Sequence, residues 1–192
     1  MKKVYVSWTD VQRQVQEIIR QMYLDGFCPD YIVGITRGGL TPATLISQYL
    51  DVPMHALKVS LRSDNETETN AWMAEDAFGY VQATSNDYSW TRCDAGQRRR
   101  ILIVDDINDS GATINWIRKD WQGSCLPDDA GWADVWNNTV RIAVLYNNES
   151  SDNEIAVDYA AEHVNKFEDP QWIVFPWEEW WRKWNPEEQH HD

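Results

Sequence analysis

The chain has 192 residues, enough for one domain with a sizeable buried core, and its hydrophobic content of 43% is ordinary for a globular protein. The formal net charge of -14 disfavours general nucleic-acid binding, because an acidic surface repels phosphate backbones. No apolar run approaches the roughly 20 residues that a transmembrane helix needs, no signal peptide is visible, and the three cysteines lack metal-binding spacing. We therefore expect a cytoplasmic protein without a nucleic-acid or membrane partner.

The hydrophobic pattern predicts strands and helices in alternation. The first strand, at 4–6, precedes a helix that is capped by Ser7 or Thr9 and closed by Gly26. The expected elements that follow are strands at 31–35 and 54–59 with a helix at 41–50 between them, then a strand at 101–104, a helix at 113–121, and strands at 141–146 and 172–175. Such alternation predicts an α/β fold with a doubly wound, mostly parallel sheet in a single domain over 1–192.

Three segments do not fit this alternation. Residues 61–90 are polar and lack clear periodicity, which is typical of a flexible functional loop or a hairpin excursion. Residues 122–138 contain glycine, proline and aspartates and are interpreted as an inserted surface loop. The Trp-rich tail, 177–192, is expected to pack on the body of the protein or on a partner subunit.

An acidic turn follows the strongest strand signal. Ligands of open parallel sheets bind beyond the carboxyl ends of the strands, and here Val104 is followed by Asp105 and Asp106. Residues 109–113 then offer a glycine, two hydroxyls and successive N–H groups at a helix start, which suits a phosphate. The alternative is a solvated acidic turn in which Asp109 or Ser110 caps the helix.

The whole run from Ile101 to Thr113 closely resembles the ribose-phosphate signature of the type I phosphoribosyltransferases. The resemblance implies that Asp105 and Asp106 bind the ribose hydroxyls of phosphoribosyl pyrophosphate, directly or through water on Mg²⁺. It implies that Asp109 is the general base for the purine imidazole. It also implies a small C-terminal hood, a flexible catalytic loop at 61–90 and a homo-oligomer, dimer or tetramer. The 5-phosphate would be held by Asp109, Ser110, Gly111, Ala112 and Thr113.

A second glycine turn lies upstream, directly after the strand predicted at 31–35. Its two glycines allow close approach of backbone N–H groups to an anion, and its arginine suits phosphate oxygens. A plain tight turn is the alternative. The turn resembles the pyrophosphate-binding loop of the same family, in which a cis peptide often precedes the arginine. Its residues are Thr36, Arg37, Gly38 and Gly39.

The segment from Gln171 to Glu178 resembles the base-binding strand of bacterial and archaeal 6-oxopurine phosphoribosyltransferases. The resemblance implies that Trp172 stacks on the purine and that the backbone at Ile173 meets its exocyclic groups; packing of Trp172 in the core is the alternative. Family members carry a lysine after the strand equivalent to 141–146, where this chain has Asn148. The identity of the base therefore stays open.

The main hypothesis from the sequence is a magnesium-dependent enzyme that transfers a phosphoribosyl group to a nucleobase, with a 6-oxopurine as the expected acceptor. Two alternatives remain. One is a non-catalytic nucleotide or phosphoribosyl pyrophosphate sensor that keeps the sugar-phosphate site, and the other is a phosphoribosyltransferase for another acceptor base.

Overall fold

The computed structural model describes residues 2–59, 71–81 and 92–178. The helices are α1 (Trp8–Leu24), α2 (Leu40–Leu50), α3 (Ala71–Phe78) and α4 (Ala112–Ser124), with short 3₁₀ turns η1 (Ala95–Gln97) and η2 (Ala130–Asp134). The strands are β1 (Lys2–Tyr5), β2 (Tyr31–Thr36), β3 (Met54–Lys58), β4 (Tyr80–Val81), β5 (Arg92–Cys93), β6 (Ile101–Asn108), β7 (Val140–Asn148), β8 (Tyr159–Val164) and β9 (Gln171–Val174).

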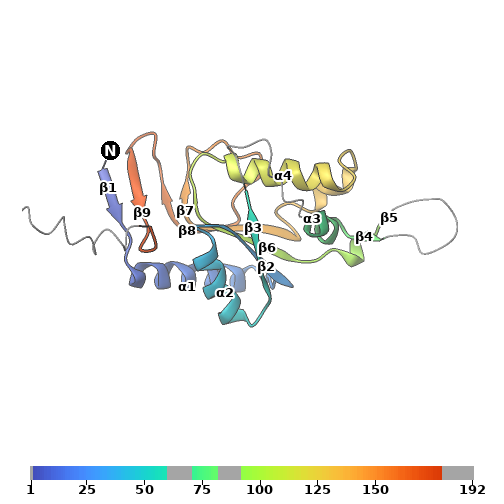
Figure 1. Cartoon of the computed structure of the whole chain (residues 1–192), viewed down its shortest axis with the longest axis horizontal. Coiled ribbons are helices and arrows are strands. Elements are labelled where there is room, and N and C mark those ends of the chain that lie inside the picture. The colour runs from blue at the N-terminus through green and yellow to red at the C-terminus, as the bar shows by residue number, and fades with distance from the viewer. Residues whose placement is uncertain (1, 60–70, 82–91, 179–192) are drawn as a thin grey trace, which may run out of the picture.

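The centre of the fold is a five-stranded sheet in the order β3-β2-β6-β7-β8, with every neighbouring pair parallel. Helices α1 and α2 cover one face, and α3 and α4 cover the other (Figure 1). Both faces need cover because the central strands are apolar on both sides. In β6, Ile101 and Ile103 pack toward α3 and α4, while Leu102 and Val104 pack toward α1 and α2. The predicted doubly wound parallel sheet is confirmed.

Helix α1 begins as the sequence predicts, at Ser7. The Ser7 hydroxyl accepts a hydrogen bond from the backbone N–H of Asp10, and the Asp10 carboxylate accepts one from the backbone N–H of Ser7. The helix buries the face that carries Val11, Val15 and Ile18 against the sheet.

A small second sheet of two strands lies beside the main sheet. It consists of β1 and β9, which pair in parallel, and it lies next to the beginning of α1 (Figure 1). Trp177 stacks on Phe175 with ring centroids 4.9 Å apart and also contacts Trp8. The expected C-terminal hood is therefore built jointly from an early and a late segment of the chain. Residues 179–192 of the Trp-rich tail lie outside the described residues.

The segment 122–138 is not the surface loop that its composition indicates. Its first three residues end α4, and the side chains of Trp132, Val135 and Trp136 are buried in the core. The indole N–H of Trp132 donates to the carbonyls of Cys125 and Leu126. The prediction was wrong because these tryptophans lack a regular period and are buried only through contacts with distant elements.

The polar segment 61–90 also contains regular structure. Residues 71–81 form α3 and β4, and β4 pairs antiparallel with β5. Helix α3 buries Met73, Ala74, Ala77 and Phe78 in the core under α4. The rest of the segment, together with residue 60 before it and residue 91 after it, lies outside the described residues. The described part of the segment thus forms a core helix, α3, followed by β4, which pairs antiparallel with β5.

Strand β8 was missed by the sequence analysis. It is an edge strand, and within it only Tyr159 and Ala160 are buried, so the run lacks the apolar character of the central strands. Among the helices that the structure describes, none is long and apolar enough to cross a bilayer.

Candidate active site

A cavity lies where the strand order of the main sheet reverses. Strands β2 and β6 are neighbours, and α2 and α4 leave their carboxyl ends toward opposite faces, which is where open α/β sheets bind ligands. The cavity has a volume of about 320 Å³. Its lining residues are Ile35, Thr36, Gly38, Val59, Asp105, Asp106, Ile107, Asn108, Asp109, Ser110, Gly111, Ala112, Thr113, Ile114, Ile142 and Val144.

The acidic pair lies inside β6, not after it. Pairing with β7 continues through Asp105 and on to Asn108, so the strand is four residues longer than predicted. Burial raises the pKa of Asp105 well above its ordinary value of 3.8, and the neighbouring charge of Asp106 adds to this effect. Burial also raises the pKa of Asp106, to which the carboxylate of Glu178 contributes. Two half-buried carboxyls of raised pKa form a site that a bound cation would stabilise.

The residues from Asp109 to Thr113 form a turn into α4. Gly111 precedes the helix with a φ of 84°, a left-handed conformation that favours glycine, and it packs closely against Asn153 and the backbone of Asp152. Gly111 at the N-cap position has no side chain that could cap the helix, and the Ser110 hydroxyl accepts a hydrogen bond of 3.4 Å from the backbone N–H of Ala112. The backbone N–H groups of Thr113 and Ile114, two further residues of the first turn that line the cavity, suit an anion there.

The glycine turn after β2 lies directly against the acidic pair. A side chain at Gly38 would overlap the carboxylate of Asp106, and one at Gly39 would meet the backbone of Val104. The peptide bond between Thr36 and Arg37 is cis, as the resemblance implies. Thr36 and Gly38 line the cavity, while Arg37 is exposed. The structure thus brings together the two glycine turns that the sequence places 70 residues apart.

Asn148, which the resemblance aligns with the base-contacting lysine, is buried and fully engaged in hydrogen bonds within the chain. Its side chain is 5% exposed, and Nδ2 donates to the carbonyl of Asp109 at 2.7 Å. Its Oδ1 accepts hydrogen bonds from Ser150 and, at 3.0 Å, from the backbone N–H of Lys166. Asn148 is not among the described residues that line the cavity. It ties three segments together beneath the site.

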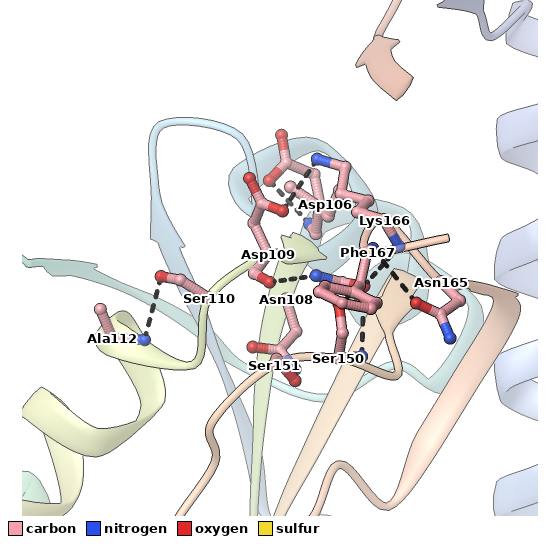
Figure 2. A network of polar contacts seen from close by, with 12 residues as sticks. Asp106, Asn108, Asp109, Ser110, Ala112, Ser150, Ser151, Asn165, Lys166 and Phe167 are labelled. Carbon is pink, nitrogen blue, oxygen red and sulfur yellow. Dashed lines mark hydrogen bonds and ion pairs between the residues drawn. The ribbon is translucent and has the colours of Figure 1, made fainter. Parts of the chain in front are cut away.

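The connection from β8 to β9 brings a lysine into the site that the sequence analysis missed. The Lys166 ammonium group lies 2.8 Å from the Asp109 carboxylate, and Figure 2 shows the side chain reaching toward it. The next residue, Phe167, is 85% exposed. Had β8 been recognised, Asn165 and Lys166 would have been found at the carboxyl end of a parallel strand, where site residues are expected.

The predicted base-binding residues lie on the hood. Trp172 in β9 is 56% exposed, opposite Lys3 of β1, and Ile173 is buried against the core. Neither is among the described residues that line the cavity. Glu178 accepts a hydrogen bond from the backbone N–H of Phe175 and lies close enough to affect the charge state of Asp106.

Comparison with known proteins places the chain in a family. The phosphoribosyl transferase domain family matches residues 5–183, so the chain belongs to the phosphoribosyltransferases. It is similar to a xanthine-guanine phosphoribosyltransferase of Cereibacter sphaeroides, with 33% identity over 61% of this chain and 64% of that relative, which is less than two thirds of its length. It is also similar to a hypoxanthine-guanine phosphoribosyltransferase of Schizosaccharomyces pombe, with 26% identity over 92% of this chain and 89% of the relative.

Solved structures agree on the fold. The chain superimposes on a purine phosphoribosyltransferase from Pyrococcus horikoshii with a TM-score of 0.57 and 22% identity, covering 93% of this chain and 95% of that one. At this identity the likeness shows the fold alone.

Proposed function

We propose that the chain transfers the phosphoribosyl group of phosphoribosyl pyrophosphate to a 6-oxopurine and releases pyrophosphate. The observation that supports the proposal is that two helices, α2 and α4, begin beside the acidic pair, and that neither N-cap glycine, Gly39 or Gly111, makes a side-chain cap hydrogen bond. A sugar with phosphate at one end and pyrophosphate at the other has the charge distribution that this arrangement fits. The named relatives, which act on xanthine, guanine or hypoxanthine, support a 6-oxopurine as the acceptor.

Each part of the sugar has a proposed partner. The turn from Asp109 to Thr113 holds the 5-phosphate, and the turn from Thr36 to Gly39 holds the pyrophosphate. Asp105 and Asp106 face the ribose hydroxyls between them. Because these groups are already in place in the folded chain, the protein lowers the barrier mainly by positioning the reactants.

Mg²⁺ is the proposed cofactor, and the acidic pair fits it. Mg²⁺ usually keeps several waters and binds through one or two carboxylates together with substrate phosphates. No group of three or more potential metal-ligating side chains is present in the described part of the chain. When bound, the ion would neutralise charge on the departing pyrophosphate.

The hood and Asp109 would serve the base. Trp172 is the proposed stacking partner of the purine, with the backbone of Ile173 beside it. A nitrogen of the base forms the new bond to the anomeric carbon as the bond to the pyrophosphate oxygen breaks, and the imidazole proton of the base passes to the Asp109 carboxylate. Asp109 lines the cavity with its side chain 59% exposed, so it is accessible to an incoming base.

We also propose that the protein is located in the cytoplasm and forms a homo-oligomer, either a dimer or a tetramer. A groove between α1 and α2 carries the exposed side chains of Tyr23, Leu24 and Tyr49. An apolar surface of this kind suits contact with a second subunit. Analytical ultracentrifugation of the full chain would test it.

Thermal denaturation tests the sugar site. Wild type with Mg²⁺ and phosphoribosyl pyrophosphate at about 100 times Kd is expected to melt about 5–10 °C higher than alone. Asp105→Asn with Asp106→Asn removes this shift, whereas the matched remote pair, Asp128→Asn with Asp129→Asn, keeps it. Absence of any shift in wild type would sink the proposal. Pyrophosphate release with each candidate base then separates a transferase from a sensor that only binds the sugar.

The same variant tests the electrostatics of the acidic pair. Because burial raises both pKa values, the two carboxyls favour the folded chain most below their ordinary pKa of 3.8, and this contribution is lost as pH rises through the raised folded values. Without metal, the Asn variant is therefore expected to melt about 2–4 °C above wild type at pH 8 and to lose that advantage toward pH 4. A variant less stable than wild type at pH 8 would contradict this electrostatic account.

A further inference from the structure

The phosphate turn, Asp109 to Thr113, packs against a short strap, residues 152–154, in the connection from β7 to β8. We propose that Asn115 is a positioning residue for the 5-phosphate, because its side chain ties this strap to the start of α4 and so fixes the N–H groups that meet the anion. This inference rests on the proposed function, since it concerns the site that the proposed function assigns to the 5-phosphate.

The first argument is the close approach of the strap to Gly111. A Cβ added at Gly111 would lie 2.5 Å from Oδ1 of Asn153 and 2.6 Å from the carbonyl oxygen of Asp152, so no side chain fits between the turn and the strap. The backbone N–H of Asp152 also donates to the carbonyl of Ser110 at 3.2 Å. Because Ser110 and Gly111 both line the cavity, the strap directly contacts two residues of the proposed phosphate site.

The second argument is that Asn115 bonds the strap and the turn at once. Its Nδ2 donates to the carbonyl of Asp152 at 2.7 Å, and its Oδ1 accepts a hydrogen bond of 2.8 Å from the backbone N–H of Glu154. Its own backbone N–H donates to the carbonyl of Gly111 at 3.0 Å. The strap therefore occupies both ends of the side-chain amide, while the backbone of the same residue closes the first turn of α4 on Gly111.

The other contacts of the strap with α4 are weaker. Oδ1 of Asn153 is buried without a hydrogen-bond partner among the described residues. Glu154 pairs with Arg118 and Lys119, but the Glu154 side chain is 40% exposed, and ion pairs that face water contribute little to stability. Asn115 therefore supplies the main polar link between the strap and the helix.

The third argument is that Gly111 does not select its own conformation. Its φ is 84°, and glycine adopts left-handed and right-handed backbone conformations about equally readily, so a contact outside the residue must favour one of them. The strap supplies that contact. A turn that is held in its binding conformation before the ligand arrives loses less conformational entropy on binding, and its affinity is higher for that reason. Removal of the tie should therefore weaken binding at the phosphate end of the sugar and not at the pyrophosphate end.

The test compares two ligands that each carry one end of the activated sugar. Ribose 5-phosphate carries only the phosphate assigned to the turn at α4, and Mg²⁺-pyrophosphate carries only the group assigned to the turn after β2. We expect Asn115→Ala to raise the Kd of ribose 5-phosphate and the KM of phosphoribosyl pyrophosphate about 10-fold each. The Kd of Mg²⁺-pyrophosphate and kcat should stay within about 2-fold of wild type. Isothermal titration calorimetry and steady-state kinetics measure these constants.

The matched control is Asn137→Ala, at the other end of the same connection. The Asn137 amide donates to the carbonyl of Ala156 and to the carboxylate of Asp158, and the residue has a φ of 57°, which alanine adopts less readily than asparagine. This variant should lower the melting temperature at least as far as Asn115→Ala does, and it should leave the Kd of ribose 5-phosphate unchanged. Loss of stability alone would then not account for a weaker phosphate site in Asn115→Ala.

Two results would overturn the inference. Equal loss of affinity for both ligands in Asn115→Ala would mean that the side chain only stabilises the fold, and unchanged affinity for ribose 5-phosphate would mean that the turn needs no tie. Failure of the proposed function looks different, because wild type would then release no pyrophosphate with hypoxanthine, guanine or xanthine. The calorimetric comparison needs no turnover, so it still decides the inference. Wild type that binds no ribose 5-phosphate would remove both the phosphate site and its positioning residue.

Discussion

The two sides of the cavity are built in different ways. The proposed sugar side comes from one continuous stretch, Ile101 to Ile114, together with the turn after β2. The proposed base side lies next to the cavity lining and combines the end of β7, the connection between β8 and β9, and the hood formed by β1 and β9. The first can be recognised from neighbouring residues in the sequence. The second exists only after distant segments have paired.

Hydrogen bonding separates the two sides as well. On the proposed sugar side, the N-cap residues of α2 and α4 are glycines that make no side-chain cap hydrogen bond, whereas α1, remote from the cavity, is capped by Ser7. On the base side, the polar groups bond one another, with Asn148 linking Asp109, Ser150 and Lys166. The sugar side presents open donors for anions, and the base side presents a fixed frame that holds a few reactive groups.

The largest effect should follow from breaking the sugar side. In Gly38→Ala the new methyl group overlaps the Asp106 carboxylate, so the glycine turn must move away from β6. We expect kcat/KM for phosphoribosyl pyrophosphate to fall at least about 100-fold and stability to fall by about 1–3 kcal/mol.

Its control is Gly123→Ala in α4, where an added Cβ has no described heavy atom within 4 Å. Alanine favours a helix over glycine by roughly 0.5–1 kcal/mol, so this variant should be slightly more stable and fully active. Steady-state kinetics and thermal melts measure both. Normal activity in Gly38→Ala would show that the turn is not held against the acidic pair.

A smaller effect should come from the residue that joins the two sides. Asn148→Ala leaves the Asp109 carbonyl and the Lys166 backbone N–H without their hydrogen-bond partner. The free energy of unfolding should therefore fall by about 2–3 kcal/mol, and the melting temperature by about 4–10 °C. Because both sides depend on it, affinity for the sugar and kcat/KM for the base should each fall about 10-fold. Asn138→Ala, which removes one exposed hydrogen bond, is the matched control. Loss of only one affinity would show that the sides are held independently.

The smallest effect should come from the base side alone. Trp172 is 56% exposed, so its proposed stacking lies at the weak end of the roughly 1–3 kcal/mol range. Trp172→Ala should raise KM for the base about 5- to 10-fold and leave KM for phosphoribosyl pyrophosphate unchanged. Tyr23→Ala removes an aromatic residue from α1 that is also exposed, by 65%, and should change neither constant. An unchanged KM for the base in Trp172→Ala would shift the stacking role to another ring, such as Phe167.

The sequence predicts most of the sheet and the sugar side because their signals are local. The four apolar residues from Ile101 mark β6, and the acids, glycine and hydroxyls that follow it mark the phosphate turn. Strand β8 was missed because only its first two residues are buried, and helix α3 was missed because its short apolar run, Ala71–Phe78, lies inside a long polar segment. The role of Asn148 was out of reach for a different reason: its partners lie 18 and 39 residues away, and only folding brings them within hydrogen-bond distance.

The pairing of β1 with β9 has a consequence for the order of synthesis. Domains generally fold as the chain emerges from its N-terminal end, and residues 31–164 contain all five strands of the main sheet. Strand β1 is synthesised first, but its partner, β9, begins only at Gln171. The two strands can therefore pair only when nearly the whole chain has been translated. The sugar site can thus take shape on the ribosome, and the hood closes over it last. A nascent chain whose residues up to Val164 have left the ribosome, while those from Gln171 onward are still inside it, would be expected to hold the sugar before it can accept a base.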